Sequence, residues 1–133
     1  VVIAIIGILA ALATVSYSDS QKKSRDSRRK ADLAAIQKAL ELAKQDTAGA
    51  YYYPNNHLTL DDSPTSPYIK VVPKDPKTNI DYVYAPTPPS CTTACTNYSL
   101  TACLENNNDS QKDVTQNEIA CPGTPVSYTI TPN

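Results

Sequence analysis

The chain of 133 residues carries 12 basic and 13 acidic side chains, and its formal net charge of −1 gives no general attraction to nucleic acid or to an anionic membrane. It lacks Met, Phe and Trp, and Tyr supplies all nine aromatic side chains. No glycine-rich phosphate loop or nucleophile elbow is present, and the single histidine, His57, has no cysteine or serine motif near it. We therefore do not expect an enzyme.

The first fifteen residues, Val1 to Val15, form an apolar run that no charged side chain interrupts. A helix that is apolar all round belongs in lipid or inside a larger assembly. At ~1.5 Å per residue the run would measure roughly 22 Å, against about 30 Å for the hydrocarbon core of a bilayer. The chain contains no Met, and we expect that a truncated or processed N-terminus lacks a few apolar residues that would complete a span. A signal peptide fits poorly, because helical character continues past Ala13.

Residues 16–46 also predict helix, because they are rich in Ala, Lys, Arg, Gln and Glu and contain neither Gly nor Pro. Apolar side chains recur at helical spacing in the second half of this stretch, with charged residues off the stripe. We therefore expect one helix over 1–46, about 70 Å long, whose lower part packs on another element. The predicted contact residues are Leu33, Ile36, Leu40 and Ala43.

Residues 47–79 change in character, because prolines recur in segments such as Tyr51 to Pro54 and Ser63-Pro64. Proline at this density excludes long regular elements. We expect a connecting loop with a short helical turn near Leu58 to Asp62, in which His57 is a solvated residue.

Three short stretches nearer the C-terminus alternate between apolar and polar side chains: Ile80–Ala85, Tyr98–Leu104 and Val126–Ile130. This alternation predicts strands of an antiparallel sheet that is covered on one side. The stripe on the helix is the expected cover, and Leu100 and Leu104 are its expected contacts. The predicted fold class is α+β, a long N-terminal helix packed on a small antiparallel sheet.

All four cysteines, Cys91, Cys95, Cys103 and Cys121, lie in residues 80–133. An even number of cysteines on a chain tethered outside the cytoplasm predicts disulfides. A bond from Cys91 to Cys95 would close a very short loop, which is feasible in a turn, and one from Cys103 to Cys121 would close a longer loop. A zinc site is the alternative, although tetrahedral sites usually come as two close pairs. We expect these two disulfides and no metal.

The apolar residues from Val1 to Ala13 resemble the N-terminal segment of type IV pilins and of the related type II secretion pseudopilins. In that family the segment follows a prepilin-peptidase site and a short apolar stretch with one glutamate, which would lie upstream of Val1. The residues Val72-Pro73-Lys74-Asp75-Pro76-Lys77 resemble the loop that leads into the sheet in pseudopilins and many pilins, and the order of elements is that of pilins. Many type IV pilins carry a proline where alignment on Gly7 places Val15. We therefore expect a continuous helix here, with any loosening confined to residues 7–18.

This resemblance implies a structural subunit, a major pilin that polymerises with itself into an extracellular type IV pilus. Before assembly its apolar helix would sit in the inner membrane, and the pilus assembly machinery would be a further partner. The alternatives are a pseudopilin of a type II secretion or competence system, and a membrane-anchored binding module that does not polymerise. The expected filament core consists of Val1, Val2, Ile3, Ile5, Ile6, Gly7, Ile8, Leu9, Leu12 and Val15.

A basic block follows the apolar run on the helix. It would surround the helix rather than form one face, so a specific nucleic-acid site is the less favoured interpretation. We expect its side chains to contact acidic groups of neighbouring subunits or lipid headgroups, and acid-first spacing predicts the local pairs Asp19–Lys23 and Asp26–Lys30. The basic residues are Lys22, Lys23, Arg25, Arg28, Arg29 and Lys30.

The loop 105–121 offers oxygen ligands at Asn106 to Asp109, Asp113 and Glu118. Some pseudopilins bind calcium in a loop of this region, but the spacing here matches no calcium motif. We expect a polar loop and no cofactor, with calcium as the alternative.

Overall fold

The computed structural model describes residues 1–46, 68–89, 91, 95–123 and 126–132, without the side chains of residues 13–15, 45 and 46. Its elements are, in chain order, α1 (Val2–Asp46), β1 (Val83–Thr87), β2 (Asn97–Leu104) and β3 (Val126–Ile130). The helix packs on a three-stranded antiparallel sheet, so the predicted α+β class is confirmed. His57, most of the connecting loop and the helical turn expected at 58–62 lie outside the described residues.

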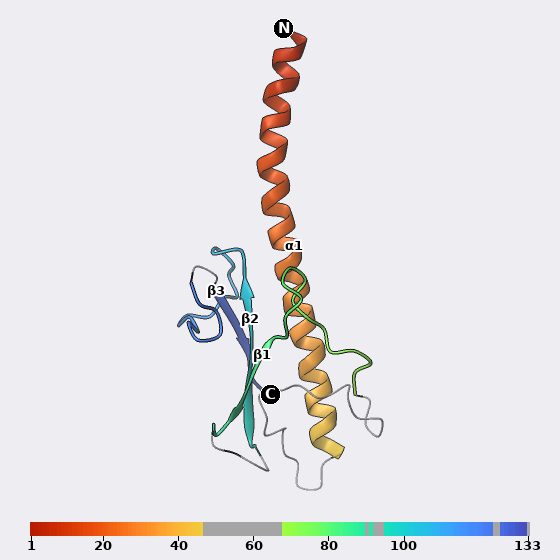
Figure 1. The fold of residues 1–133 in the computed structure, drawn as a ribbon, viewed down its shortest axis with the longest axis vertical. Coiled ribbons are helices and arrows are strands. Elements are labelled where there is room, and N and C mark those ends of the chain that lie inside the picture. Colours follow the sequence, from red (N-terminus) through yellow and green to blue (C-terminus); the bar gives the residue numbers. More distant parts are fainter. Residues whose placement is uncertain (47–67, 90, 92–94, 124–125, 133) are drawn as a thin grey trace.

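The helix α1 runs without a break over 45 residues, which corresponds to a length of about 68 Å. Its first half projects beyond the sheet, and its second half lies beside the sheet (Figure 1). Neither Gly7 nor the backbone at Val15 interrupts the helix. The prediction of one helix over residues 1–46 is therefore confirmed.

The sheet has β2 at its centre, with β1 and β3 as its two edges. β1 pairs antiparallel with β2 from Val83↔Thr101 to Thr87↔Asn97, and β3 pairs with β2 from Leu100↔Ile130 to Leu104↔Val126. The bounds of β3 are those expected from the alternation, and β2 begins one residue earlier than expected.

The strand expected at Ile80–Ala85 is displaced, because β1 begins only at Val83 and continues through Pro86 to Thr87. The Ile80 carbonyl accepts a hydrogen bond from the Asp75 amide at 3.0 Å, within a turn in which Asn79 has a φ of 57°. That turn holds the chain before Val83 away from the ladder. Pro86 is tolerated in the strand because β1 is an edge, where a missing N–H need not cost a ladder bond.

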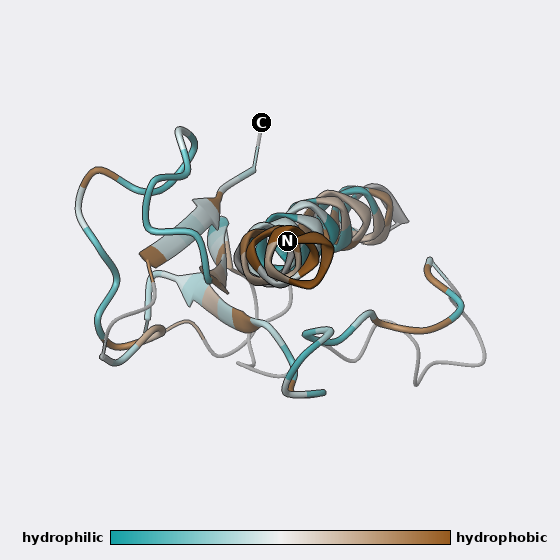
Figure 2. Cartoon of the chain, turned by 90° about the horizontal axis from the view of Figure 1, so that it is seen from above, coloured by the Kyte–Doolittle hydropathy of each residue, from teal (hydrophilic) through white to brown (hydrophobic). Residues whose placement is uncertain are grey.

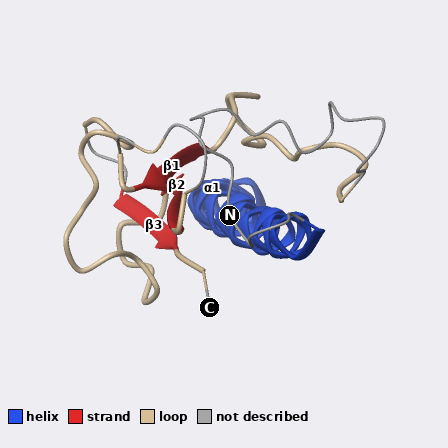
Figure 3. Cartoon of the chain, turned by 90° about the horizontal axis from the view of Figure 1, so that it is seen from below, coloured by secondary structure: helices blue, strands red, loops and turns tan. Residues whose placement is uncertain are grey.

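The core lies between one face of the sheet and the lower half of α1, which contacts β2 and β3. Figures 2 and 3 show the sheet on one side of the helix. All six predicted contact residues are buried, and Ala39 and the ring pair Tyr84–Tyr98, with centroids 5.6 Å apart, complete the contact. Burying a Leu or Ile side chain contributes about 1.5–3 kcal/mol relative to exposure, so this apolar contact holds the helix on the sheet. The buried residues are Leu33, Ile36, Ala39, Leu40 and Ala43 on the helix, and Tyr84, Tyr98, Leu100, Ala102 and Leu104 on the strands.

Candidate functional site

The first turns of α1 carry an apolar surface that the described part of the chain does not cover. All side chains of residues 1–12 are exposed, and the large apolar ones range from 53% exposed at Ile5 to 101% at Val1. Apolar residues occur all round the helix here, and the ribbon of the turns nearest the N-terminus is largely brown in Figure 2. All predicted filament-core residues belong to this surface except Val15, whose side chain is not described.

Gly7 lies in the middle of this surface. A Cβ atom placed on Gly7 would meet no atom within 4 Å apart from its chain neighbours and the backbone of its own helix. No contact within the described chain therefore requires a glycine at this position. Small residues matter where a second helix approaches closely, so Gly7 marks a face that another helix can reach.

By length and composition, α1 can cross a membrane. The segment Val2–Lys44 contains an 18-residue window that is apolar enough for a span, and none of that window is buried in the described chain. Length and composition alone thus indicate membrane anchoring through the N-terminal helix.

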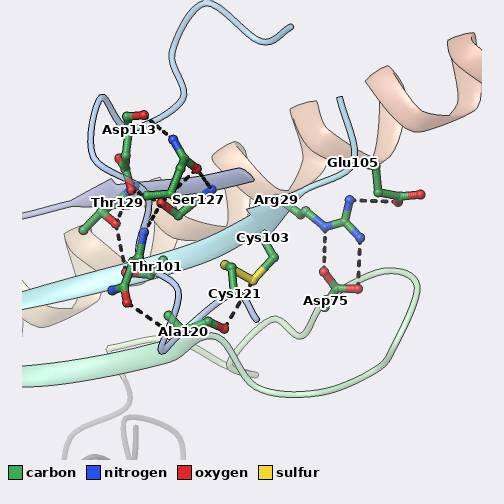
Figure 4. The surroundings of a disulfide bond; sticks show 12 residues. Arg29, Asp75, Thr101, Cys103, Glu105, Asp113, Ala120, Cys121, Ser127 and Thr129 are labelled. Atoms are coloured by element: carbon green, nitrogen blue, oxygen red, sulfur yellow. Dashed lines mark hydrogen bonds and ion pairs between the residues drawn. A yellow bond between two sulfur atoms is a disulfide. The ribbon is translucent and has the colours of Figure 1, made fainter. Parts of the chain in front are cut away.

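Arg29 joins the helix to the sheet directly beyond the exposed half of α1. Its side chain is 3% exposed and donates from Nε to Asp75 Oδ2 at 2.6 Å and from Nη2 to Asp75 Oδ1 at 3.2 Å. Its Nη1 donates to Asp26 Oδ1 at 2.7 Å and to Glu105 Oε1 at 2.9 Å. One guanidinium therefore connects α1, the loop before β1 and the residue that follows β2 (Figure 4). We call Arg29 and its three carboxylate partners the arginine clamp.

Neighbouring side chains extend the clamp. The Asp26 carboxylate accepts the backbone N–H groups of Glu105 at 2.9 Å and of Asn106 at 2.8 Å, which fixes the end of β2 on the helix. Arg25 holds Glu105 with two hydrogen bonds, Nε to Oε1 at 2.7 Å and Nη2 to Oε2 at 2.9 Å. Lys77 adds a third cation 3.2 Å from Oε2 of the same carboxylate.

Arg29, Glu105 and Asp75 of the clamp remain charged at neutral pH. Burial alone lowers the pKa of Arg29, but its hydrogen bonds to Asp75, Glu105 and Asp26 outweigh burial and raise that pKa. The hydrogen bond from Arg25 lowers the pKa of Glu105 to about 2, against the opposing effect of burial. Burial would raise the pKa of Asp75, but hydrogen bonds from Arg29 and from two backbone amides hold it well below its usual range.

The expectation that the basic block meets neighbouring subunits or lipid is wrong for Arg25, Arg29 and Lys30, which bind partners in the same chain. Lys30 Nζ donates to Asp109 Oδ1 at 2.6 Å and lies 5.5 Å from the centroid of the Tyr128 ring. Lys22, Lys23 and Arg28 keep exposed or half-exposed side chains.

The two predicted local pairs are also wrong, because Asp26 binds Arg29 and Asp19 lies 3.5 Å from Lys22. The clamp was not predicted from the sequence, because two of its carboxylates, Asp75 and Glu105, lie far from Arg29 along the chain. Two features of the sequence could have indicated the clamp: Asp26 and Arg29 are three positions apart on one helix, and the acid Glu105 directly follows a predicted strand.

The loop considered for calcium uses its acids within the chain. Asp113 accepts the Thr129 amide at 2.8 Å, the Thr129 hydroxyl at 2.7 Å and the Ser127 hydroxyl at 2.6 Å (Figure 4). The Asp113 amide also donates to the Ser127 carbonyl at 2.8 Å, so the loop covers the free edge of β3, where an uncovered strand could pair with another chain. Among the described residues no group of three or more His, Cys, Asp or Glu side chains is placed to hold a metal.

Two disulfides join Cys91 to Cys95 and Cys103 to Cys121, which are the pairs expected from the sequence. The second bond ties the loop before β3 to β2, beside the clamp (Figure 4). The four sulfurs are therefore engaged with one another rather than with zinc.

A partly open cavity of about 650 Å³ lies next to the clamp. Its apolar walls include Ile80, Val83 and Pro122, and Lys22 and Lys77 also line it. The cavity thus brings a lysine of α1 and a lysine of the loop before β1 to one opening.

Comparison with protein-family models, with curated proteins and with solved structures finds no match to this chain. Its form is an apolar N-terminal helix over a small antiparallel sheet with two disulfides, which is compatible with a pilin-like protein.

Proposed function

We propose that this chain is a structural subunit that polymerises with itself into an extracellular filament of the type IV pilus kind. The apolar segment is residues 1–15. The observation that carries the proposal is the exposure of its residues 1–12, on a helix whose other half is fixed to a folded head. By the head we mean the sheet, its loops and the part of α1 from Arg25 onwards.

The apolar segment needs an environment other than water. Each Val, Leu or Ile side chain that leaves water contributes about 1.5–3 kcal/mol, and these residues make up most of the segment. Lipid and the apolar segments of other copies are the two environments that can cover a helix from all sides. Membrane anchoring and assembly are therefore two successive uses of one surface.

The transfer from lipid to a filament core gains little from the hydrophobic effect, because lipid tails are themselves apolar. Close packing of the helices must therefore supply most of the free energy that favours the filament, and small side chains permit such close packing. The segment offers such residues at Gly7, Ala10 and Ala11. Pilus assembly machinery would supply the work of extracting each subunit from the inner membrane.

The head suits the outside of such a filament. The core and the arginine clamp fix its position relative to α1, so stacking of the helices would place the heads regularly around them. The two disulfides suit an oxidising compartment outside the cytoplasm.

Electron microscopy of the sheared surface fraction, with immunogold labelling of this chain, tests the proposal. Filaments that consist mainly of this chain are the expected result. Labelled material that stays in the membrane fraction as monomers would instead support an anchored binding module. Filaments that form only when a secretion system is overproduced would support a pseudopilin.

A pair of substitutions connects the filament to the apolar segment. Ile8→Asp places a charge on the segment, where Ile8 is 64% exposed, and should abolish filaments. Leu42→Asp is the matched control, because Leu42 is 50% exposed on the same helix but belongs to the part of α1 that lies in the head. Filaments of normal abundance in Ile8→Asp would exclude the segment as the assembly surface.

A further inference from the structure

We propose that the Cys103–Cys121 disulfide is a redox lock, which holds residues 113–117 on the free edge of β3 and which a dithiol opens through the cavity beside the clamp. We call residues 113–117 the edge cover. The inference concerns the head alone, so it goes beyond the proposed function and does not depend on filament assembly or on a membrane.

The edge cover takes the place of a fourth strand beside β3. The Ser127 carbonyl accepts the Asp113 N–H at 2.8 Å, and the Ser127 N–H donates to Gln116 Oε1 at 2.5 Å. The Thr129 N–H donates to Asp113 Oδ1 at 2.8 Å. These backbone groups point away from β2, and a neighbouring strand would otherwise bind them. The cover therefore keeps this edge from pairing with another chain.

Asn117 connects the edge cover to the disulfide. Its N–H donates to Ser127 Oγ at 2.9 Å, at the end of the cover. Its carbonyl accepts the Cys121 N–H at 2.8 Å, and its Oδ1 accepts the Ala120 N–H at 3.1 Å. The turn 117–121 therefore leads directly from the cover to Cys121, and the disulfide attaches this turn to β2 at Cys103 (Figure 4).

The first part of the same loop has a separate anchor on the helix. The Asp26 carboxylate accepts the N–H groups of Glu105 and Asn106, and Lys30 Nζ donates to Asp109 Oδ1. These contacts do not involve the disulfide. Its loss should therefore loosen residues 113–121 and leave residues 105–109 in place.

The cavity beside the clamp gives a small molecule access to the disulfide. Cys103 lines this partly open cavity of about 650 Å³, together with Ala120 and Pro122 on either side of Cys121. Cys103 is half-buried, whereas Cys121 is 3% exposed. Cys103 is therefore the residue at which a thiolate can attack the bond.

Opening of the lock is a thiol–disulfide exchange with a dithiol as the reductant. One thiolate of the dithiol attacks the Cys103 sulfur, the Cys103–Cys121 bond breaks, and Cys121 leaves as a thiolate that takes up a proton. The second thiol of the dithiol then attacks its own sulfur in this mixed disulfide and releases Cys103 as a thiol. The dithiol becomes a cyclic disulfide, and two electrons and two protons pass to the two cysteines.

Hydrogen exchange of single amides tests the lock, measured by NMR on the full chain in detergent micelles. In Cys103→Ser/Cys121→Ser the amides of Ser127 and Thr129 should exchange at least about tenfold faster than in the parent chain. The Tyr128 amide should be unchanged, because it faces β2 opposite Ala102. The Asn106 amide, held by Asp26, should also be unchanged.

Cys91→Ser/Cys95→Ser is the matched control and should leave the amides of Ser127 and Thr129 as they are. If Cys103→Ser/Cys121→Ser does not fold, the same measurement on the folded parent chain after reduction with dithiothreitol decides. Unchanged exchange at Ser127 and Thr129 would overturn the lock. Equal acceleration at Tyr128 would also overturn it, because the whole sheet would then be opening.

The rate of reduction tests the route through the cavity. Dithiothreitol is added to the folded chain, and alkylation followed by peptide mass spectrometry measures how fast Cys103 and Cys121 become free. Ile80→Trp adds bulk to a wall of the cavity and should slow this reaction severalfold. Val71→Trp is the control, because Val71 is as exposed as Ile80, at 66% against 65%, but lies outside the residues that line the cavity. Equal rates in Ile80→Trp and the parent chain would overturn the route through the cavity.

Discussion

Arg29 Nε lies 2.6 Å from Asp75 Oδ2, although the two residues are 46 positions apart in the chain. The same guanidinium also binds Asp26 and Glu105, so the helix, the loop before β1 and the end of β2 meet at one buried cation. This joint lies at the end of the head where α1 emerges. It therefore sets the direction in which the apolar segment leaves the head, which a regular filament would require.

Replacing Arg29 should destabilise the head strongly. Arg29→Ala leaves two or three carboxylates without their buried cation, and breaking a buried ion pair in this way costs about 3–5 kcal/mol of the free energy of unfolding. Thermal or denaturant unfolding in detergent micelles measures the loss. Arg28→Ala is the matched control, because Arg28 is exposed on the same helix and its removal should cost less than about 1 kcal/mol. Equal losses in the two variants would mean that the clamp does not hold the head on α1.

Acid should weaken the clamp. The pKa of Glu105 is about 2 in the fold against an ordinary 4.5, and the pKa of Asp75 is lowered as well. A carboxylate with a depressed pKa contributes its full stabilisation above its unfolded pKa and loses it as the pH falls through its folded pKa. The free energy of unfolding should therefore fall between about pH 4.5 and pH 2.

Denaturant titrations at pH 7, 4.5 and 2 measure this change. Glu105→Gln should be less stable than the parent chain at pH 7 and should depend less on pH in the acid range. Stability that rises on acidification below pH 4.5 would contradict the assigned ionisation of the clamp.

The sequence predicted well those features that depend on local periodicity. The apolar stripe from Leu33 to Ala43 and the alternation at Tyr98–Leu104 are each visible within a single element, and the apolar residues of both patterns are buried in the structure. The disulfide pairs were also predicted, because Cys91 and Cys95 can close a very short loop in a turn and leave Cys103 and Cys121 to close a longer one.

Features that depend on contacts between distant segments could not be predicted in this way. The start of β1 is set by a turn between Asp75 and Ile80, which competes with the ladder for the Ile80 carbonyl. The partners of Arg29 and Lys30 lie in loops whose path is fixed only after the sheet has formed. Helical spacing therefore suggested local ion pairs, whereas folding supplied closer and more buried partners.

The two disulfides should contribute unequally to stability. In the chain-entropy account, the stabilisation rises with the length of the closed loop, and the Cys103–Cys121 bond spans 18 residues against 4 for Cys91–Cys95. The double variant Cys103→Ser/Cys121→Ser, which lacks the disulfide of the longer loop, should lose about 3 kcal/mol of the free energy of unfolding. The double variant Cys91→Ser/Cys95→Ser, which lacks that of the shorter loop, should lose about 2 kcal/mol. Urea unfolding of both double variants measures the difference, and the reverse order would show that native-state contacts outweigh loop entropy.

Gly7→Ala should affect the stability of the single chain and its assembly into filaments in different ways. Glycine within a helix costs about 1 kcal/mol relative to alanine, and the added Cβ would meet no atom within 4 Å beyond its chain neighbours and its own helix backbone. The helix of the isolated subunit should therefore be unchanged or more stable, as measured by circular dichroism in micelles. Filament yield should nevertheless fall, because the methyl group would hold neighbouring helices apart in a tightly packed core. Ser24→Ala, a small exposed position beyond the apolar segment, should leave the yield unchanged. If Gly7→Ala assembled normally, the helices would have to meet through another face of the segment, and Ala10 and Ala11 would be the next positions to substitute.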